Sequence, residues 1–145
     1  MSLLVNKKAR HDYTILDQIQ AGIVLTGSEV KSLRLGRGTL AGSFVQIIDQ
    51  QAVLLGAQIN PYPYADNRDY DPKRTRRLLL RKSEIYHLAE KVKQKRYTLI
   101  PLSFDLVGKN IKLTIGLGRG KKQYEKKALL RERDLQRERA REFNF

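Results

Sequence analysis

Alternating apolar and polar positions recur through the first 118 residues and predict short β-strands. Residues 111–115 read Ile-Lys-Leu-Thr-Ile, and residues 102–106 just upstream read Leu-Ser-Phe-Asp-Leu. A period of two is typical of a strand with one buried face. We expect residues 107–110 between them, which read Val-Gly-Lys-Asn, to form the turn of a hairpin.

A second hairpin is expected around residues 49–51. Its arms are residues 44–48 and 53–59, which are rich in Val, Ile and Leu. Residues 13–16 and 23–25 add two further strand-like runs. These runs predict about six short strands in all.

Two short helices are expected among the strands. Residues Thr26 to Glu29 read Thr-Gly-Ser-Glu, the form of a capping box in which an acid follows the N-cap hydroxyl by three residues. In the helix that follows, Lys31 and Arg34 face outward. The second helix is expected to have Ser83 as its N-cap, because apolar residues recur beyond it at i, i+3, i+4 and i+7.

These elements predict a mainly β fold, an OB-type closed β-barrel of about six strands with two or three short helices. Such barrels are a common frame for binding nucleic acid. The periodic pattern ends at residues 116–118, which read Gly-Leu-Gly, and 15 of the 27 later residues are charged. We therefore expect an OB-type RNA-binding barrel over residues 1–118, a flexible glycine joint, and a basic C-terminal tail over residues 119–145.

The tail has helix-forming composition but no apolar stripe. Its arginines Arg133 and Arg137 lie four apart, so they would share one face of a helix. A helix that is polar all round has no core against which to pack, and about 20 residues without packing form a marginal helix in water. The tail is expected to be disordered alone and helical on a polyanion.

The charge balance indicates the partner. Lys and Arg total 29 against 15 Asp and Glu, a formal net charge of +14. A surplus of this size predicts a polyanionic partner, with nucleic acid first and an anionic membrane second. Dense basic clusters at residues 6–10, 73–77 and 121–127 suit phosphate contacts. In the first cluster, Lys7 and Arg10 are the expected RNA contacts.

Several protein classes are excluded. The chain has no cysteine, and His11 and His87 lie too far apart for a short metal-ligand motif, so we expect no metal and no cofactor. No uncharged apolar run approaches the roughly 20 residues of a membrane span, and the N-terminus lacks the pattern of a signal peptide. A cytoplasmic protein without membrane contact is expected. Nothing in the pattern requires a dimer, so a monomer is expected.

An enzyme is not expected. Residues 116–120 contain three glycines, but the third does not stand at the spacing that a dinucleotide fingerprint needs. A nuclease-like metal site at Asp66, Asp69 and Asp71 is the alternative to turn formation beside prolines, and turn formation is favoured. His87 is expected to be structural, whereas His11 either stacks on a base or forms structural hydrogen bonds.

The loop from Asn60 to Pro72 contains three tyrosines, Tyr62, Tyr64 and Tyr70. Its length is typical of a functional or a disordered loop. The tyrosines either stack on bases or pin the loop to the barrel, and the sequence does not choose between these roles.

Four motifs in order resemble the SsrA-binding protein family, also called small protein B. They cover residues 6–13, 21–34, 71–80 and 115–127. The resemblance implies a tmRNA-binding protein of trans-translation that binds the tRNA-like domain of tmRNA. It further implies delivery, with elongation factor Tu, to ribosomes stalled on messages lacking a stop codon. A generic OB-type RNA-binding or ribosome-associated protein is the alternative.

The resemblance also implies site residues. Asn6, Leu79 and Lys112 match positions that the family uses around tmRNA. Glu29, Lys31 and Arg34 lie within a matching motif, and Gln20 stands where the family usually has an acid. The tail would occupy the decoding centre in place of codon–anticodon pairing, with Tyr124 stacking there. Its predicted contacts to small-subunit ribosomal RNA are Lys121, Lys122, Tyr124, Lys126, Lys127, Arg133 and Arg137.

Overall fold

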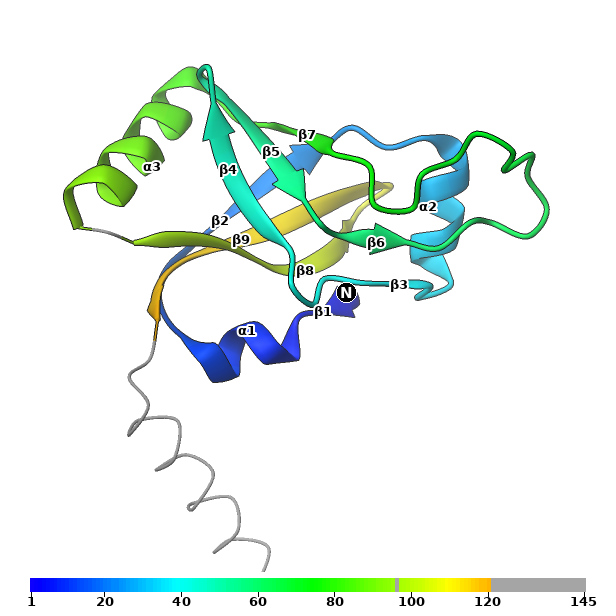
Figure 1. Cartoon of the computed structure of the whole chain (residues 1–145), viewed down its shortest axis with the longest axis horizontal. Helices are drawn as coiled ribbons and strands as arrows, with labels where there is room; N and C mark the ends of the chain where they lie inside the picture. The colour runs from blue at the N-terminus through cyan, green and yellow to red at the C-terminus, as the bar shows by residue number, and fades with distance from the viewer. Residues whose placement is uncertain (96, 121–145) are drawn as a thin grey trace, which may run out of the picture.

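The computed structural model describes residues 1–95 and 97–120, which form a mainly β structure with three helices (Figure 1). The tail beyond Gly120, with its predicted disorder and induced helix, lies outside the described residues. The elements in chain order are β1 (Ser2–Val5), α1 (Lys7–Asp12), β2 (Tyr13–Ile23), α2 (Gly27–Arg34), β3 (Gly38–Thr39), β4 (Phe44–Ile48), β5 (Gln51–Leu55), β6 (Gln58–Ile59), β7 (Arg76–Leu79), α3 (Lys82–Lys95), β8 (Thr98–Val107) and β9 (Asn110–Gly120).

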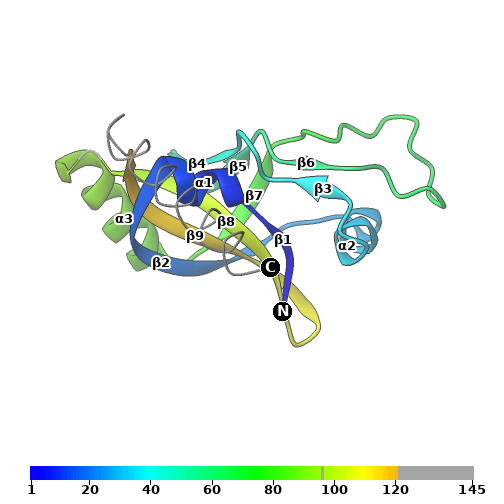
Figure 2. The same ribbon diagram turned by 90° about the horizontal axis from the view of Figure 1, so that it is seen from below.

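One antiparallel sheet organises the described residues. Its seven strands run in the order β1-β8-β9-β2-β7-β5-β4, and β3 and β6 form a separate two-stranded ladder. The mainly β prediction is confirmed, with more strands than the six expected. The sheet curls so that β4 approaches β8 (Figure 2). Within residues 1–95 and 97–120 no ladder joins edge strands β4 and β1, so the closed barrel is not confirmed.

The core follows the predicted alternation. Leu113 and Ile115 of β9 are almost completely buried, as is Phe104 of the neighbouring β8. Leu33 of α2 and Leu88 of α3 pack into the same cluster from the two ends of the sheet. Burying such side chains stabilises the fold by about 1.5–3 kcal/mol each.

Both predicted hairpins are confirmed. The β4–β5 turn places Asp49 and Gln50 at φ angles of 49° and 62°, and two successive positive φ values are the requirement of a type I′ turn. The β8–β9 turn has Gly108 at φ 62° in its first central position. Glycine adopts that conformation without strain.

The predicted glycine joint is wrong. Gly116 and Gly118 are buried inside β9, paired on one side with β2 and on the other with β8. A Cβ atom on Gly116 would lie 2.9 Å from Leu102 Cδ1, and one on Gly118 would lie 2.9 Å from the carbonyl oxygen of Thr14. These glycines allow close packing of three strands, and β9 continues to Gly120.

The helix starts are partly as predicted. The capping box is confirmed, because Thr26 Oγ1 accepts from the Glu29 N–H at 3.2 Å and Glu29 Oε1 accepts from the Thr26 N–H at 2.9 Å. Helix α3 begins one residue before Ser83, so Ser83 is not its N-cap. The Glu84 carboxylate instead accepts from the Arg81 N–H at 3.0 Å.

None of the helices among the described residues has the length and hydropathy to cross a membrane.

The N-terminal third differs from the predicted pattern. Residues 13–16 and 23–25 are not separate runs, because residues 13–23 form the single strand β2, which bulges between Ile15 and Asp17. Strand β1 and helix α1 are additional to the predicted elements. Strand β1 pairs with the distant β8, and α1 packs against β2 and β8.

Candidate RNA interface

Three residues form a row across the outer face of the sheet. Gly22 of β2 pairs with Lys112 of β9 on one side and with Leu79 of β7 on the other. Directly paired residues of neighbouring strands project from the same face. Gly22 has no side chain, and the Leu79 side chain lies over it. A Cβ atom on Gly22 would lie 3.2 Å from Leu79 Cβ and 3.5 Å from Leu79 Cδ1, so a side chain at this position would press against Leu79.

This row lies in a wide groove, here called the β7 groove, of about 880 Å³. It gathers Gln20, Leu79 and Lys112, three of the predicted site residues. The lining also includes Arg77, Arg81 and Lys82 as cations, and Asp49 and Glu84 as acids. Cations beside an exposed aliphatic side chain and an amide suit phosphate, sugar and base contacts of RNA.

The β7 groove continues toward α2. A second depression of about 350 Å³ shares Gly22, Leu79 and Lys112 with it and extends to Lys109 and to Val30 of α2. Leu79 is 53% exposed at the junction of the two hollows. The connected surface therefore runs from the start of α3 to α2.

Helix α1 carries a separate basic group. Lys7 and Arg10 are exposed on α1, which Figure 1 shows below the sheet, whereas β7 lies above it. Asn6 is 5% exposed, and its Nδ2 donates to the carbonyl oxygens of Leu40 and Pro101, at 3.3 and 2.9 Å. Its Oδ1 accepts from the Ala9 N–H at 3.2 Å, so Asn6 is the N-cap of α1. Asn6 thus orients α1 rather than facing solvent.

Helix α2 presents Lys31 and Arg34 to solvent, but Glu29 lies inside. The Glu29 carboxylate accepts hydrogen bonds from Arg74 and Arg76. Burial alone would raise its pKa, but the bonds from Arg74, the Thr26 N–H and Arg76 outweigh burial and lower the pKa to about 2. Glu29 is therefore a charged structural centre in the folded chain.

The basic cluster at residues 73–77 lies only partly on the surface. The Arg76 side chain has no exposed surface, and the Arg74 side chain, 31% exposed, forms an ion pair with Glu29. Arg77 of the same cluster is exposed in the β7 groove. Sequence reasoning missed the structural arginines, because a basic cluster does not reveal which of its members turns inward.

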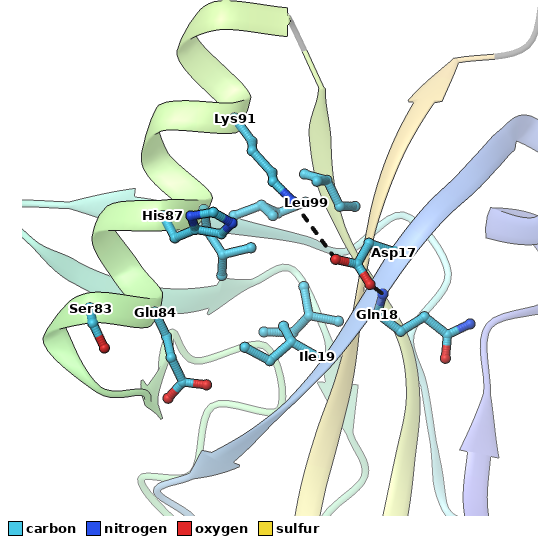
Figure 3. A pocket seen from close by; sticks show the side chains of 11 residues that line it. Asp17, Gln18, Ile19, Ser83, Glu84, His87, Lys91 and Leu99 are labelled. Atoms are coloured by element: carbon cyan, nitrogen blue, oxygen red, sulfur yellow. Dashed lines mark hydrogen bonds and ion pairs between the residues drawn. The ribbon is translucent and has the colours of Figure 1, made fainter.

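A smaller cavity of about 340 Å³ lies between α3 and the sheet (Figure 3). Its floor is apolar, and Lys91 Nζ lies 3.8 Å from Asp17 Oδ2 at its edge. His87, expected as structural, is exposed on α3 beside this cavity. His11 is half-buried, and its Nδ1 lies 2.9 Å from Asp12 Oδ1. This contact favours structural hydrogen bonding over stacking on a base.

The loop acids form turns and local ion pairs. Asp66 accepts from the N–H and the guanidinium of Arg68, and Asp71 accepts from the N–H of Lys73. Across residues 1–95 and 97–120, no three His, Asp or Glu side chains are grouped to hold a metal ion. The predicted tail contacts, from Lys121 to Arg137, lie outside the described residues.

Comparison with known proteins adds a family. A family model described as SmpB protein matches residues 3–145. The chain is 45% identical to the SsrA-binding protein of Paraburkholderia xenovorans, over 97% of this chain and 96% of that relative. It is 50% identical to the SsrA-binding protein of a Sulfurihydrogenibium species, over 92% and 88%. A solved structure described as "tmRNA-SmpB: a journey to the center of the bacterial ribosome" matches with a TM-score of 0.69 at 45% identity, covering 83% of this chain and 85% of that one.

Proposed function

Because the chain belongs to the SsrA-binding protein (SmpB) family, we propose that it binds tmRNA and acts with the ribosome in trans-translation. The observation that carries the proposal is the row of Lys112, Gly22 and Leu79 in the β7 groove. The solved relative couples SmpB with tmRNA and the bacterial ribosome. The tRNA-like domain of tmRNA is the proposed ligand of the groove.

The residues of the β7 groove have distinct tasks. Lys112 binds a phosphate as a mobile point charge. Leu79 packs against sugar or base surface, which explains why an aliphatic side chain 53% exposed lies among cations. Gln20 both donates and accepts hydrogen bonds, so it suits a ribose 2′-hydroxyl. Gly22 leaves room for the Leu79 side chain to lie across β2.

The proposed frame for this groove is an OB-type barrel that is open between β4 and β1. The order of the strands and the approach of β4 to β8 support this form. OB-type barrels bind oligonucleotides on the outer face of their sheet. In this chain that face contains the row from Lys112 to Leu79.

The tail has a separate proposed role. Its cations and Tyr124 would contact small-subunit ribosomal RNA in the decoding centre of a stalled ribosome, in place of codon–anticodon pairing. Elongation factor Tu is the proposed carrier of the complex to the ribosome. The chain itself is proposed to be a binding adaptor between two RNAs in the cytoplasm, with chemistry left to the ribosome.

The test is a binding comparison at one fixed salt concentration. The chain should bind the tRNA-like domain of tmRNA more tightly than an equal-length tRNA and a random RNA. Equal affinity for all three would support the generic OB-type alternative and reject the specific proposal. Adding magnesium and following RNA integrity tests the nuclease alternative in the same samples.

A further inference from the structure

Residues 60–72, in the connection between β6 and β7, form a loop that projects past α2 at the end of the molecule opposite α3 (Figures 1 and 2). Its two ends are held together, because the Ile59 N–H donates to the Pro72 carbonyl oxygen at 3.0 Å. The Tyr70 hydroxyl donates to the Ile59 carbonyl oxygen at 2.8 Å and also lies 3.2 Å from Glu29 Oε2. Tyr70 therefore pins the base of the loop to the buried ion pair.

The tip of the loop is ordered by its own hydrogen bonds. The Tyr62 carbonyl oxygen accepts from the Ala65 N–H at 3.1 Å and from Asn67 Nδ2 at 2.8 Å. Pro63 stands between, and its fixed φ angle favours such a turn. Compact loops of this kind, with closed ends and internal contacts, are frequently functional.

The tip presents one aromatic ring to solvent. Tyr64 is 87% exposed, and it meets Tyr62 edge to face at a centroid distance of 5.5 Å. Lys31 Nζ of α2 lies 5.5 Å from the centroid of the Tyr62 ring. The roles of the tyrosines are thus divided: Tyr70 pins the loop, Tyr62 supports the tip against α2, and Tyr64 faces outward.

We propose that Tyr64 stacks on an unpaired base of the RNA bound in the β7 groove, while Lys31 and Arg34 bind phosphates beside that base. This inference rests on the proposed function. Every base has an apolar face, so an exposed aromatic ring next to cations suits an unpaired nucleotide. The ordered tip reduces the entropy lost on binding.

The position of the tip favours RNA over a protein partner. The depression that continues the β7 groove reaches Val30, the residue before Lys31. An RNA on Lys112 can therefore extend along α2 to the tip. Asp66, two residues after Tyr64, forms an ion pair with the guanidinium of Arg68 at 2.9 Å, which offsets part of its repulsion of phosphate.

Single substitutions test the stacking role. Tyr64→Ala should weaken binding of the tRNA-like domain at least about fivefold, the lower limit of one base–aromatic stack. Tyr64→Phe should bind like the unaltered chain, because it keeps the ring. Tyr86→Ala, which removes a tyrosine 69% exposed on α3, is the matched control and should have no effect. Lys31→Ala should reduce the salt dependence, whereas Tyr64→Ala should leave it unchanged.

A spectroscopic readout is available because the chain has no tryptophan. In a Tyr64→Trp variant, saturating RNA should quench the emission of the single indole. A Tyr86→Trp variant should show little change. This comparison reports contact at the tip directly, and it does not depend on affinity.

The outcomes separate this inference from the proposed function. If the unaltered chain selects tmRNA but Tyr64→Ala binds equally well and the indole emission of Tyr64→Trp stays constant, the stacking role is rejected and the function stands. If the indole emission of Tyr64→Trp changes on adding RNA-free ribosomal proteins but not on adding RNA, the loop tip contacts a protein and the inference is rejected. Absence of tmRNA selectivity in the unaltered chain would reject the proposed function itself.

Discussion

Glu29 Oε2 lies 2.6 Å from Arg76 Nη2, and neither side chain has exposed surface. Arg76 also donates to the carbonyl oxygens of Ala57 and Pro72, at 2.8 and 3.0 Å. One buried ion pair thus connects α2 with the segment between β5 and β6 and with the end of the loop of residues 60–72. The pair fixes α2 relative to β7, and both elements contribute to the proposed RNA surface.

Breaking this pair should destabilise the fold. Arg76→Met would leave Glu29 in the interior with only Arg74 as its cationic partner, at a cost of about 3 kcal/mol in the free energy of unfolding. The double variant Glu29→Met/Arg76→Met should lose less than the sum of the single variants, because no unpaired charge remains. Urea denaturation measures both. A loss below about 1 kcal/mol in Arg76→Met would contradict a structural role.

The same carboxylate predicts an acid-sensitive stability. Its pKa is lowered from 4.5 to about 2 in the folded chain, so the stabilisation is complete above about pH 4.5 and is lost as the pH falls toward 2. A shift of this size corresponds to roughly 3 kcal/mol. Denaturation between about pH 6 and pH 2 should show a steeper loss in the unaltered chain than in Glu29→Gln. Parallel curves for the two chains would exclude Glu29 as the source.

The β7 groove makes a prediction about salt. If Lys112 neutralises one phosphate, Lys112→Ala should reduce the slope of log K against log salt by roughly one. Leu79→Ala should weaken binding without changing the slope, because it removes no charge. Lys93→Ala, on the polar side of α3, is the matched charge control. An unchanged slope in Lys112→Ala would remove this lysine from the interface.

Asn6 should act through the position of α1. Asn6→Ser keeps a side-chain oxygen that can cap the helix but loses the two hydrogen bonds that Nδ2 donates to Leu40 and Pro101. Asn6→Ala loses all three bonds, so it should be the less stable variant, by about 1 kcal/mol. Thermal unfolding of the two variants measures the difference. Equal stability of Asn6→Ala and the unaltered chain would contradict the capping role.

Local periodicity predicted the parts of the fold that depend on neighbours in sequence. The β8–β9 hairpin, the β4–β5 hairpin and the Thr26 capping box all follow from residues within a few positions of one another. Long-range contacts were not accessible in this way. Gly116 and Gly118 suggest flexibility by themselves, and only their closeness to Leu102 and Thr14 explains them as packed strand residues.

The candidate site shows the same limit. Gln20, Leu79 and Lys112 are distant in sequence, and they share one groove because β2 lies between β7 and β9. Periodicity did predict that Lys112 faces outward. It could not identify Arg76 as buried, since its partner Glu29 is 47 positions away. The family resemblance predicted that Asn6 and Glu29 bind RNA. Both are buried, so they support the surface from within.

The central claim is that the chain selects tmRNA through the β7 groove. The most direct measurement is sequencing of the RNA that copurifies with the full chain from cells that contain tmRNA, beside a Leu79→Ala/Lys112→Ala variant. We expect strong enrichment of tmRNA over tRNA with the unaltered chain and loss of that enrichment in the variant. Enrichment of tRNA and tmRNA in proportion to their abundance, or tmRNA retained equally by the variant, would contradict it.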